Sequence, residues 1–179
     1  MWYQAQRRLS AEHQALQRAA PQPYTAHPND TGLLHWFAHP PCVPSCPFAH
    51  NTAIPTTPHR TLTLRGPPAT PYSGGTFYVD LVFPAEYPAR GPEVRFLTRV
   101  FHPQVGAGGE TWLALTDAQH WRSTYGIADV ATALLALLAA PTAAGACANA
   151  DAARMLDADD ETFAAEAARW TAQYARRPF

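Results

Sequence analysis

The stretch that decides the fold of this chain is Gly66-Pro67-Pro68-Ala69-Thr70-Pro71-Tyr72-Ser73-Gly74-Gly75-Thr76-Phe77, followed by Phe83-Pro84-Ala85-Glu86-Tyr87-Pro88. Clustered prolines restrict the backbone direction, and two adjacent glycines permit a tight turn where side chains would clash. Between the two segments every second residue is apolar: Phe77, Val79, Leu81 and Phe83. This alternation predicts a half-buried strand over 77–83, bounded by rigid turns.

The sequence on either side predicts the remaining elements. Trp2 to Arg18 has the apolar spacing of an amphipathic helix, interrupted by the polar Glu12. We predict a first strand at Leu33–Phe37, a second at Thr61–Leu64 and a fourth at Glu93–Leu97. Helical periodicity then predicts a helix over Ile127–Ala140 and a last helix that presents Phe163, Ala167, Trp170 and Tyr174. The fold class is α+β: an N-terminal helix, a four-stranded antiparallel meander sheet and C-terminal helices.

We interpret residues 1–179 as a single domain, with a proline-rich insertion at about 39–59 between the first two strands. This insertion contains Cys42, Cys46, His50 and His59, which are residue types that bind zinc. The spacing is wider than in common zinc sites, so a local disulfide or free thiols are alternatives. We expect no cofactor, and the metal site stays the less favoured interpretation.

Charge and hydropathy exclude several classes of partner. The formal net charge is -1 and no long basic run occurs, so neither nucleic acid nor an anionic membrane is indicated. No apolar run reaches the roughly 20 residues that span a bilayer. All 13 Lys+Arg residues are arginine, and the first 20 residues are poor in acids. That start fits either a mitochondrial presequence or, as we prefer, the first helix of the domain.

A series of segments, in order and at matching spacings, resembles the ubiquitin-conjugating enzymes almost from end to end. Besides the two segments quoted above, the series comprises Pro92-Glu93-Val94-Arg95-Phe96, Phe101-His102-Pro103, Trp121, Ile127, Asn149-Ala150-Asp151-Ala152-Ala153 and Trp170-Thr171-Ala172-Gln173-Tyr174-Ala175. The resemblance implies the fold of that family, the ubiquitin-conjugating (UBC) fold.

Members of this family carry ubiquitin as a thioester on a cysteine in a Gly-x-x-Cys-Leu context, shortly after a His-Pro-Asn motif. The matching stretch here is Gly109-Glu110-Thr111-Trp112-Leu113, with Trp112 at the cysteine position. A thioester needs a thiolate, which an indole cannot supply. After His102 the family's asparagine is replaced by Gln104, and acidic residues near the site are replaced by Ala143, Ala144 and Gly145. We therefore expect a catalytically inactive member.

Cys147 follows the helix predicted at 127–140 and is the alternative nucleophile, in a segment that the resemblance places near the degenerate site. No neighbouring base or cation in the sequence would activate this thiol, so we favour a small, half-buried residue.

The favoured interpretation of function is a non-catalytic UBC-fold protein that acts as a structural or protein–protein interaction module. We expect other protein subunits of a larger assembly as partners, in the mitochondrion or the cytoplasm. The alternative is a cysteine-less variant that serves as cofactor of an active conjugating enzyme and binds ubiquitin. Those variants typically lose the His-Pro motif and the C-terminal helices, both of which this chain keeps.

Overall fold

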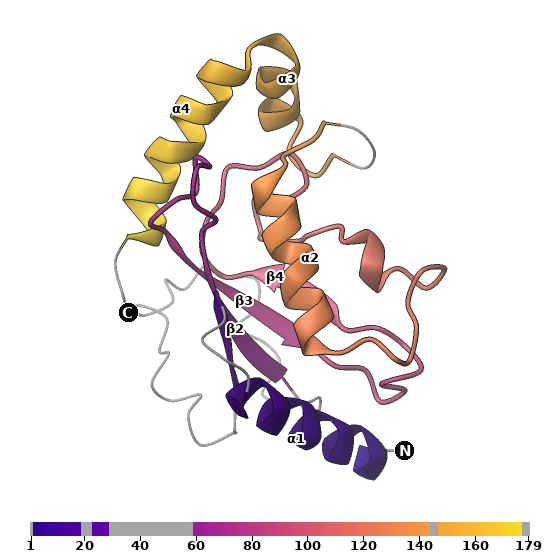
Figure 1. Cartoon of the computed structure of the whole chain (residues 1–179). Helices are drawn as coiled ribbons and strands as arrows, with labels where there is room; N and C mark the ends of the chain where they lie inside the picture. Colours follow the sequence, from indigo (N-terminus) through magenta and orange to yellow (C-terminus); the bar gives the residue numbers. More distant parts are fainter. Residues whose placement is uncertain (1, 19–22, 29–58, 144–146, 177–179) are drawn as a thin grey trace, which may run out of the picture.

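The computed structural model describes residues 2–18, 23–28, 59–143 and 147–176 (Figure 1). Within these ranges the elements are α1 (Trp2–Arg18), β1 (Tyr24–Pro28), β2 (His59–Arg65), β3 (Thr76–Val82), β4 (Glu93–Phe96), the short 3-10 helix η1 (Ala114–Thr116), α2 (Ile127–Ala139), α3 (Ala150–Ala158), α4 (Asp160–Trp170) and the π-helical turn η2 (Thr171–Ala175). The predicted α+β class is confirmed.

The four strands form one antiparallel meander in the order β1-β2-β3-β4. The register places Ala26, Leu62, Val79 and Phe96 side by side in one row across the sheet. All four side chains are buried. Because side chains alternate between the two faces of a strand, this register gathers the apolar residues of every strand on one face.

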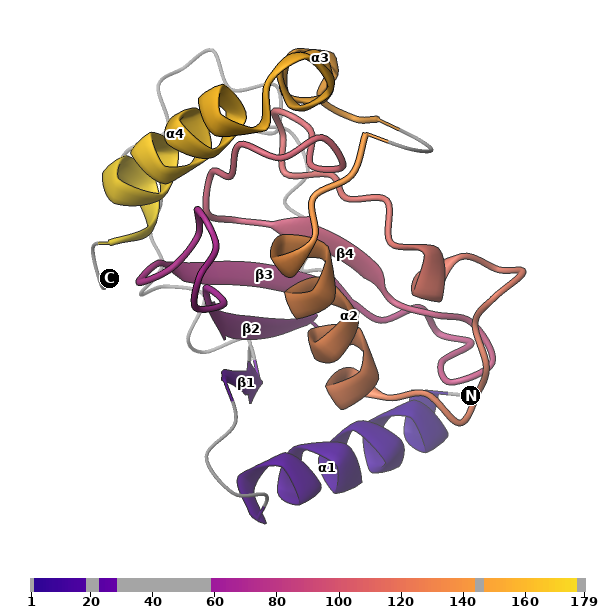
Figure 2. The same ribbon diagram turned by 45° about the horizontal axis from the view of Figure 1, so that its top comes forward.

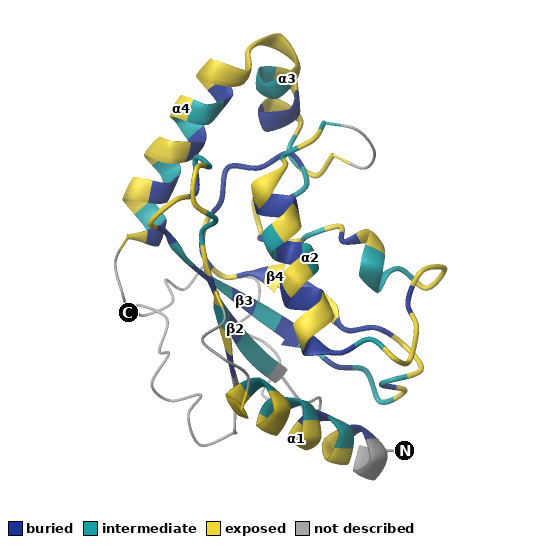
Figure 3. Ribbon diagram, in the orientation of Figure 1, coloured by how far each residue is buried: buried dark blue, intermediate teal, exposed yellow. Residues whose placement is uncertain are grey.

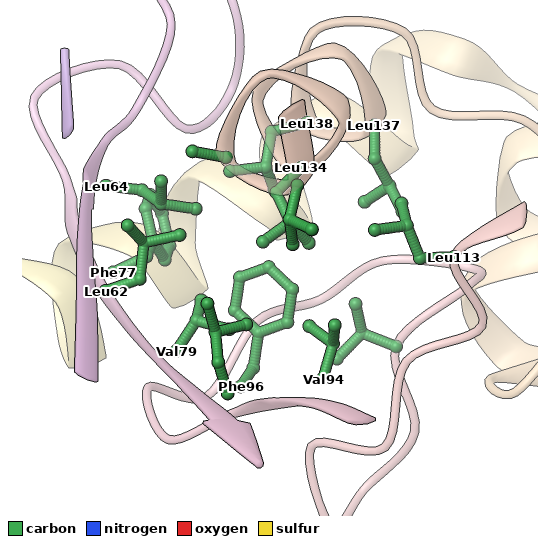
Figure 4. Packing of buried hydrophobic residues seen from close by; sticks show 14 of the residues in the cluster. Leu62, Leu64, Phe77, Val79, Val94, Phe96, Leu113, Leu134, Leu137 and Leu138 are labelled. Carbon is green, nitrogen blue, oxygen red and sulfur yellow. The ribbon is translucent and has the colours of Figure 1, made fainter. Parts of the chain in front are cut away.

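Helix α2 covers that apolar face (Figure 2). Its residues Val130, Leu134 and Leu138 are fully buried. Figure 4 shows Leu134 and Leu138 pointing from the helix toward the row that contains Val79 and Phe96. Burying one such leucine contributes about 2 kcal/mol, so this layer is the main source of the fold's stability. Figure 3 shows the same division along α2, with buried residues on one side of the helix and exposed residues on the other.

The first strand differs from the prediction. The structure forms β1 at Tyr24–Pro28, where no strand was predicted from the sequence. Proline is tolerated here because β1 is the outermost strand of the described sheet and pairs with β2 alone. The strand predicted at Leu33–Phe37 lies outside the described residues, as do residues 39–58 of the predicted insertion. The single-domain interpretation therefore stays a prediction.

Glu12, the polar break in the apolar stripe of α1, joins this helix to the rest of the molecule. Its carboxylate accepts hydrogen bonds from the Tyr87 hydroxyl at 2.9 and 3.1 Å and from the Ile127 backbone N–H at 3.0 Å. It also pairs with Arg8 at 2.5 Å. Ala5 and Leu9 on the same face are fully buried. This packing supports the interpretation of residues 2–18 as the first helix of the domain.

The C-terminal helices pack at the far end of the sheet from α1 (Figure 1). Phe163 and Ala167 are buried, and the ring of Phe101 contacts the rings of Phe163 at 5.8 Å and Trp170 at 5.6 Å. The predicted apolar spacing of the last helix is thereby confirmed. No helix within the described ranges is long and apolar enough to cross a membrane.

Candidate functional site

A buried histidine holds the loop that precedes Trp112. His102 is 0% exposed, and its Nε2 lies 3.1 Å from the Leu137 carbonyl oxygen of α2. Its Nδ1 accepts the backbone N–H of Gln104 at 3.0 Å. With Nδ1 as an acceptor, the proton resides on Nε2 and is donated to Leu137. Burial lowers the pKa of His102 to about 4, so the ring is neutral at physiological pH and braces the loop against α2.

A glycine turn leads from this loop to Trp112. The Gly109 N–H donates to the Gly106 carbonyl at 2.9 Å, and the Phe96 N–H donates to the Gly109 carbonyl at 2.8 Å. Gly109 has φ +82, and a Cβ at this position would lie 1.9 Å from the Phe96 oxygen. Only glycine fits this conformation and this close approach to β4.

The backbone pairing explains which way Trp112 points. Glu110 bridges to Arg95 in antiparallel fashion, so residues 109–113 run alongside β4 as a short extended segment. Gly109 and Leu113 are buried, whereas Glu110 and Trp112 are exposed, as the two-residue period of extended chain requires. Leu113 extends toward Leu137 in the core (Figure 4). The indole of Trp112 therefore projects outward and is 54% exposed.

A side chain at this exposed position can contact another molecule. Which chemistry is possible there depends on the residue type. Acyl transfer requires a side chain that is both a nucleophile and a leaving group. The indole of Trp112 has no ionisable donor atom of this kind, and its N–H is a hydrogen-bond donor only. Gln104 is half-buried in the turn that His102 holds. At position 112 the side chain offers an aromatic surface and one hydrogen-bond donor.

A hollow of about 630 Å³ surrounds the exposed indole. It is formed by the ends of β3 and β4, the segment containing Trp112, and the turn after η1. Its charged lining residues are Asp80, Glu93, Glu110 and Asp117, with Arg90 and Arg95. These residues were not predicted as site residues from the sequence, although the alternation of exposed positions in β4 places Glu93 and Arg95 on the same face as Trp112.

The segment of Cys147 lies against the other end of the His102 loop. The backbone N–H of Asn149 donates to the Pro103 carbonyl at 2.9 Å. Cys147 itself is exposed, and its Sγ lies 3.0 Å from the Ala143 carbonyl oxygen. The half-buried position expected for this thiol is therefore wrong: the structure leaves it open to solvent. Its role as a nucleophile stays a separate prediction.

Several predicted site residues lie outside the described residues. These are Cys42, Cys46 and His50 of the suggested metal site, together with Ala144 and Gly145. His59 begins β2, but the position of its side chain is also outside what the structure describes. The metal site therefore stays a prediction.

Comparison with known proteins agrees with this architecture. The profile of the family described as "Ubiquitin-conjugating enzyme" matches residues 51–171. The chain is similar to "Ubiquitin-conjugating enzyme E2 3" of Arabidopsis thaliana, with 32% identity over 151 residues, which cover 84% of this chain and 83% of that protein. The matched region includes the sheet strands β2 to β4, α2 and the segment of Trp112. This chain belongs to the ubiquitin-conjugating enzyme family.

Proposed function

We propose that this chain is a non-catalytic member of its family, which forms no ubiquitin thioester and works by binding other proteins as an accessory subunit of a larger assembly. The observation that carries the proposal is Trp112, which stands where the sequence motifs of the family place the catalytic cysteine and which is 54% exposed. A large aromatic side chain at an open position is typical of protein interfaces and has no role in acyl transfer.

The surroundings of Trp112 support this proposal. Burial keeps His102 neutral, and both of its ring nitrogens are engaged in the fold. It therefore braces the loop and is not free to move protons at the site. The fold itself is kept intact around the site, with α2 packed on the sheet and α3 and α4 in place. An intact scaffold that lacks the nucleophile can still bind partners, so these features fit a binding function.

The first experiment tests whether the chain accepts ubiquitin. The purified protein is incubated with ubiquitin, ATP and a ubiquitin-activating enzyme, and its intact mass is measured without reductant, with an active conjugating enzyme as the positive control. We expect no ubiquitin adduct. A reductant-sensitive adduct that disappears in Cys147→Ser would overturn the proposal and assign catalysis to Cys147.

The second experiment identifies the partners. The native protein is purified under mild conditions and its apparent mass is compared with the 19.5 kDa of the chain. We expect a large complex of several unrelated subunits. A lone monomer contradicts the accessory-subunit proposal. A stable pair with one conjugating enzyme also contradicts it and establishes the cofactor alternative.

A further inference from the structure

Among the described residues, two large hydrophobic side chains are exposed to solvent, and both lie beside the edge strand β4. These are Leu97 at 57% and Trp112 at 54%. The bridge between Arg95 and Glu110 relates the two positions. Leu97 directly follows the last residue of β4, two positions beyond the bridge in one direction, and Trp112 lies two positions beyond it in the other. The pair formed by β4 and residues 109–113 therefore carries one exposed hydrophobic side chain toward each of its ends.

The two ends of this pair differ in their surroundings. Leu97 borders a hollow lined by Arg99, Asp151, Trp170 and the glycine turn. Arg99 is already stacked on the ring of Tyr174 at 5.6 Å, and Asp151 pairs with Arg154. The hollow around Trp112 is instead rich in carboxylates, with four acidic side chains against two arginines. The hollow at Trp112 therefore has an excess of negative charge, which the hollow at Leu97 lacks.

Several of the charged side chains that line the hollow around Trp112 face solvent. Arg90 and Glu93 pair with each other at 4.0 Å, both well exposed. Asp117 lies 3.6 Å from the Nδ1 of His120. Glu110 is exposed and lines the same hollow as Trp112, and its carboxylate lies against the turn at Gly106 and Gly108. The lining has a formal charge of -2, from its four carboxylates and two guanidinium groups.

From this geometry we infer that the hollow around Trp112 is a docking site for an arginine- or lysine-bearing segment of a partner protein. This inference rests on the proposed binding function and names the surface that performs it. The partner's cation lies over the face of the Trp112 ring, where the ring quadrupole attracts it. The carboxylates that line the hollow, among them Asp117 and Glu110, supply the opposite charge. The occupant is a cationic segment, since the excess of carboxylates would repel an acidic one.

The test is a titration followed by ¹⁵N–¹H NMR spectroscopy. The probe is the capped peptide acetyl-Gly-Arg-Gly-Arg-Gly-amide, and its control is the same peptide with citrulline in place of arginine. Citrulline keeps the shape of arginine but not its charge. The indole N–H signal of Trp112 is assigned from its loss in Trp112→Phe. We expect the arginine peptide to shift this signal and to bind at least about fivefold more tightly than the citrulline peptide, with the preference falling as salt is added.

Variants of the protein provide matched controls. Trp112→Ala and the double variant Glu110→Gln/Asp117→Asn should each weaken binding of the arginine peptide. Leu97→Ala, which removes the other exposed anchor, should leave it unchanged. Equal binding of both peptides, no shift up to several millimolar peptide, or equal loss in Leu97→Ala would each refute the inference. Shifts at Trp112 that grow with protein concentration alone would also refute it, by assigning the site to a second copy of this chain.

The ubiquitin-transfer assay keeps the two proposals separate. If the peptide fails to bind and no ubiquitin adduct forms, the docking site is wrong and the non-catalytic function stands. If a ubiquitin adduct forms, the non-catalytic function itself is wrong.

Discussion

Removing the carboxylate of Glu12 should destabilise the protein more than any other change to an ion pair in its described part. The change Glu12→Ala leaves the Tyr87 hydroxyl and the Ile127 N–H without their acceptor. A hydrogen bond to a charged group contributes about 1.5–3 kcal/mol. The Glu12 side chain is 13% exposed, so water replaces part of what is lost. The Arg8 pair adds less than about 1 kcal/mol, since its guanidinium is 40% exposed. We expect a total loss of about 3 kcal/mol.

The assay is equilibrium unfolding in urea at neutral pH, followed by circular dichroism. Tyr87→Phe should lose about 1.5 kcal/mol, since it removes one of these hydrogen bonds. Combining it with Glu12→Ala should show a coupling of about 1 kcal/mol or more, because the two groups share one contact. Arg90→Ala is the matched control: it breaks the exposed pair with Glu93 at 4.0 Å and should change stability by less than about 0.5 kcal/mol.

The reasoning is refuted if Glu12→Ala unfolds within about 0.5 kcal/mol of the natural protein, the range of an ordinary surface substitution. Strict additivity of the Glu12 and Tyr87 changes would also count against it. Either result would mean that α1 is held by Ala5 and Leu9 alone.

Other parts of the fold give three further predictions. Burial lowers the pKa of His102 from 6.5 to about 4, so protonation favours the unfolded chain and about 3 kcal/mol of stability, fully present above pH 6.5, is lost as the pH falls toward 4. His102→Gln should flatten the stability–pH profile measured by urea unfolding over that window. Gly109→Ala should lower the melting temperature far more than Gly74→Ala. Both glycines have positive φ, but only at position 109 would the added Cβ lie 1.9 Å from a backbone oxygen, that of Phe96. Trp112→Ala should change the unfolding free energy by less than about 1 kcal/mol, because the ring is 54% exposed.

The helices and strands whose pattern is local in the sequence could be predicted. The strand β3 follows from the alternation that begins at Phe77, and α2 begins at the predicted Ile127. The same local rule gives the orientation of Trp112, because Gly109 and Leu113 take the buried positions of the extended segment. The assignment of position 112 to the family's cysteine rests on motifs that lie close to it in the chain, and it stays a prediction. Strand β1 was missed because it is short and ends in Pro28, which only a strand at the edge of a sheet tolerates.

The sequence by itself therefore determined the fold class, the order of most elements and the absence of a cysteine at position 112. Only the tertiary structure decided the roles of Glu12 and His102 and the charge around Trp112. Glu12 meets a backbone group 115 residues away, and His102 meets one 35 residues away. Periodicity reports which face of an element a residue occupies, but not what that face meets. The protonation of a buried ring and the charge of a hollow are set by those distant neighbours, so they emerge only when the chain has folded.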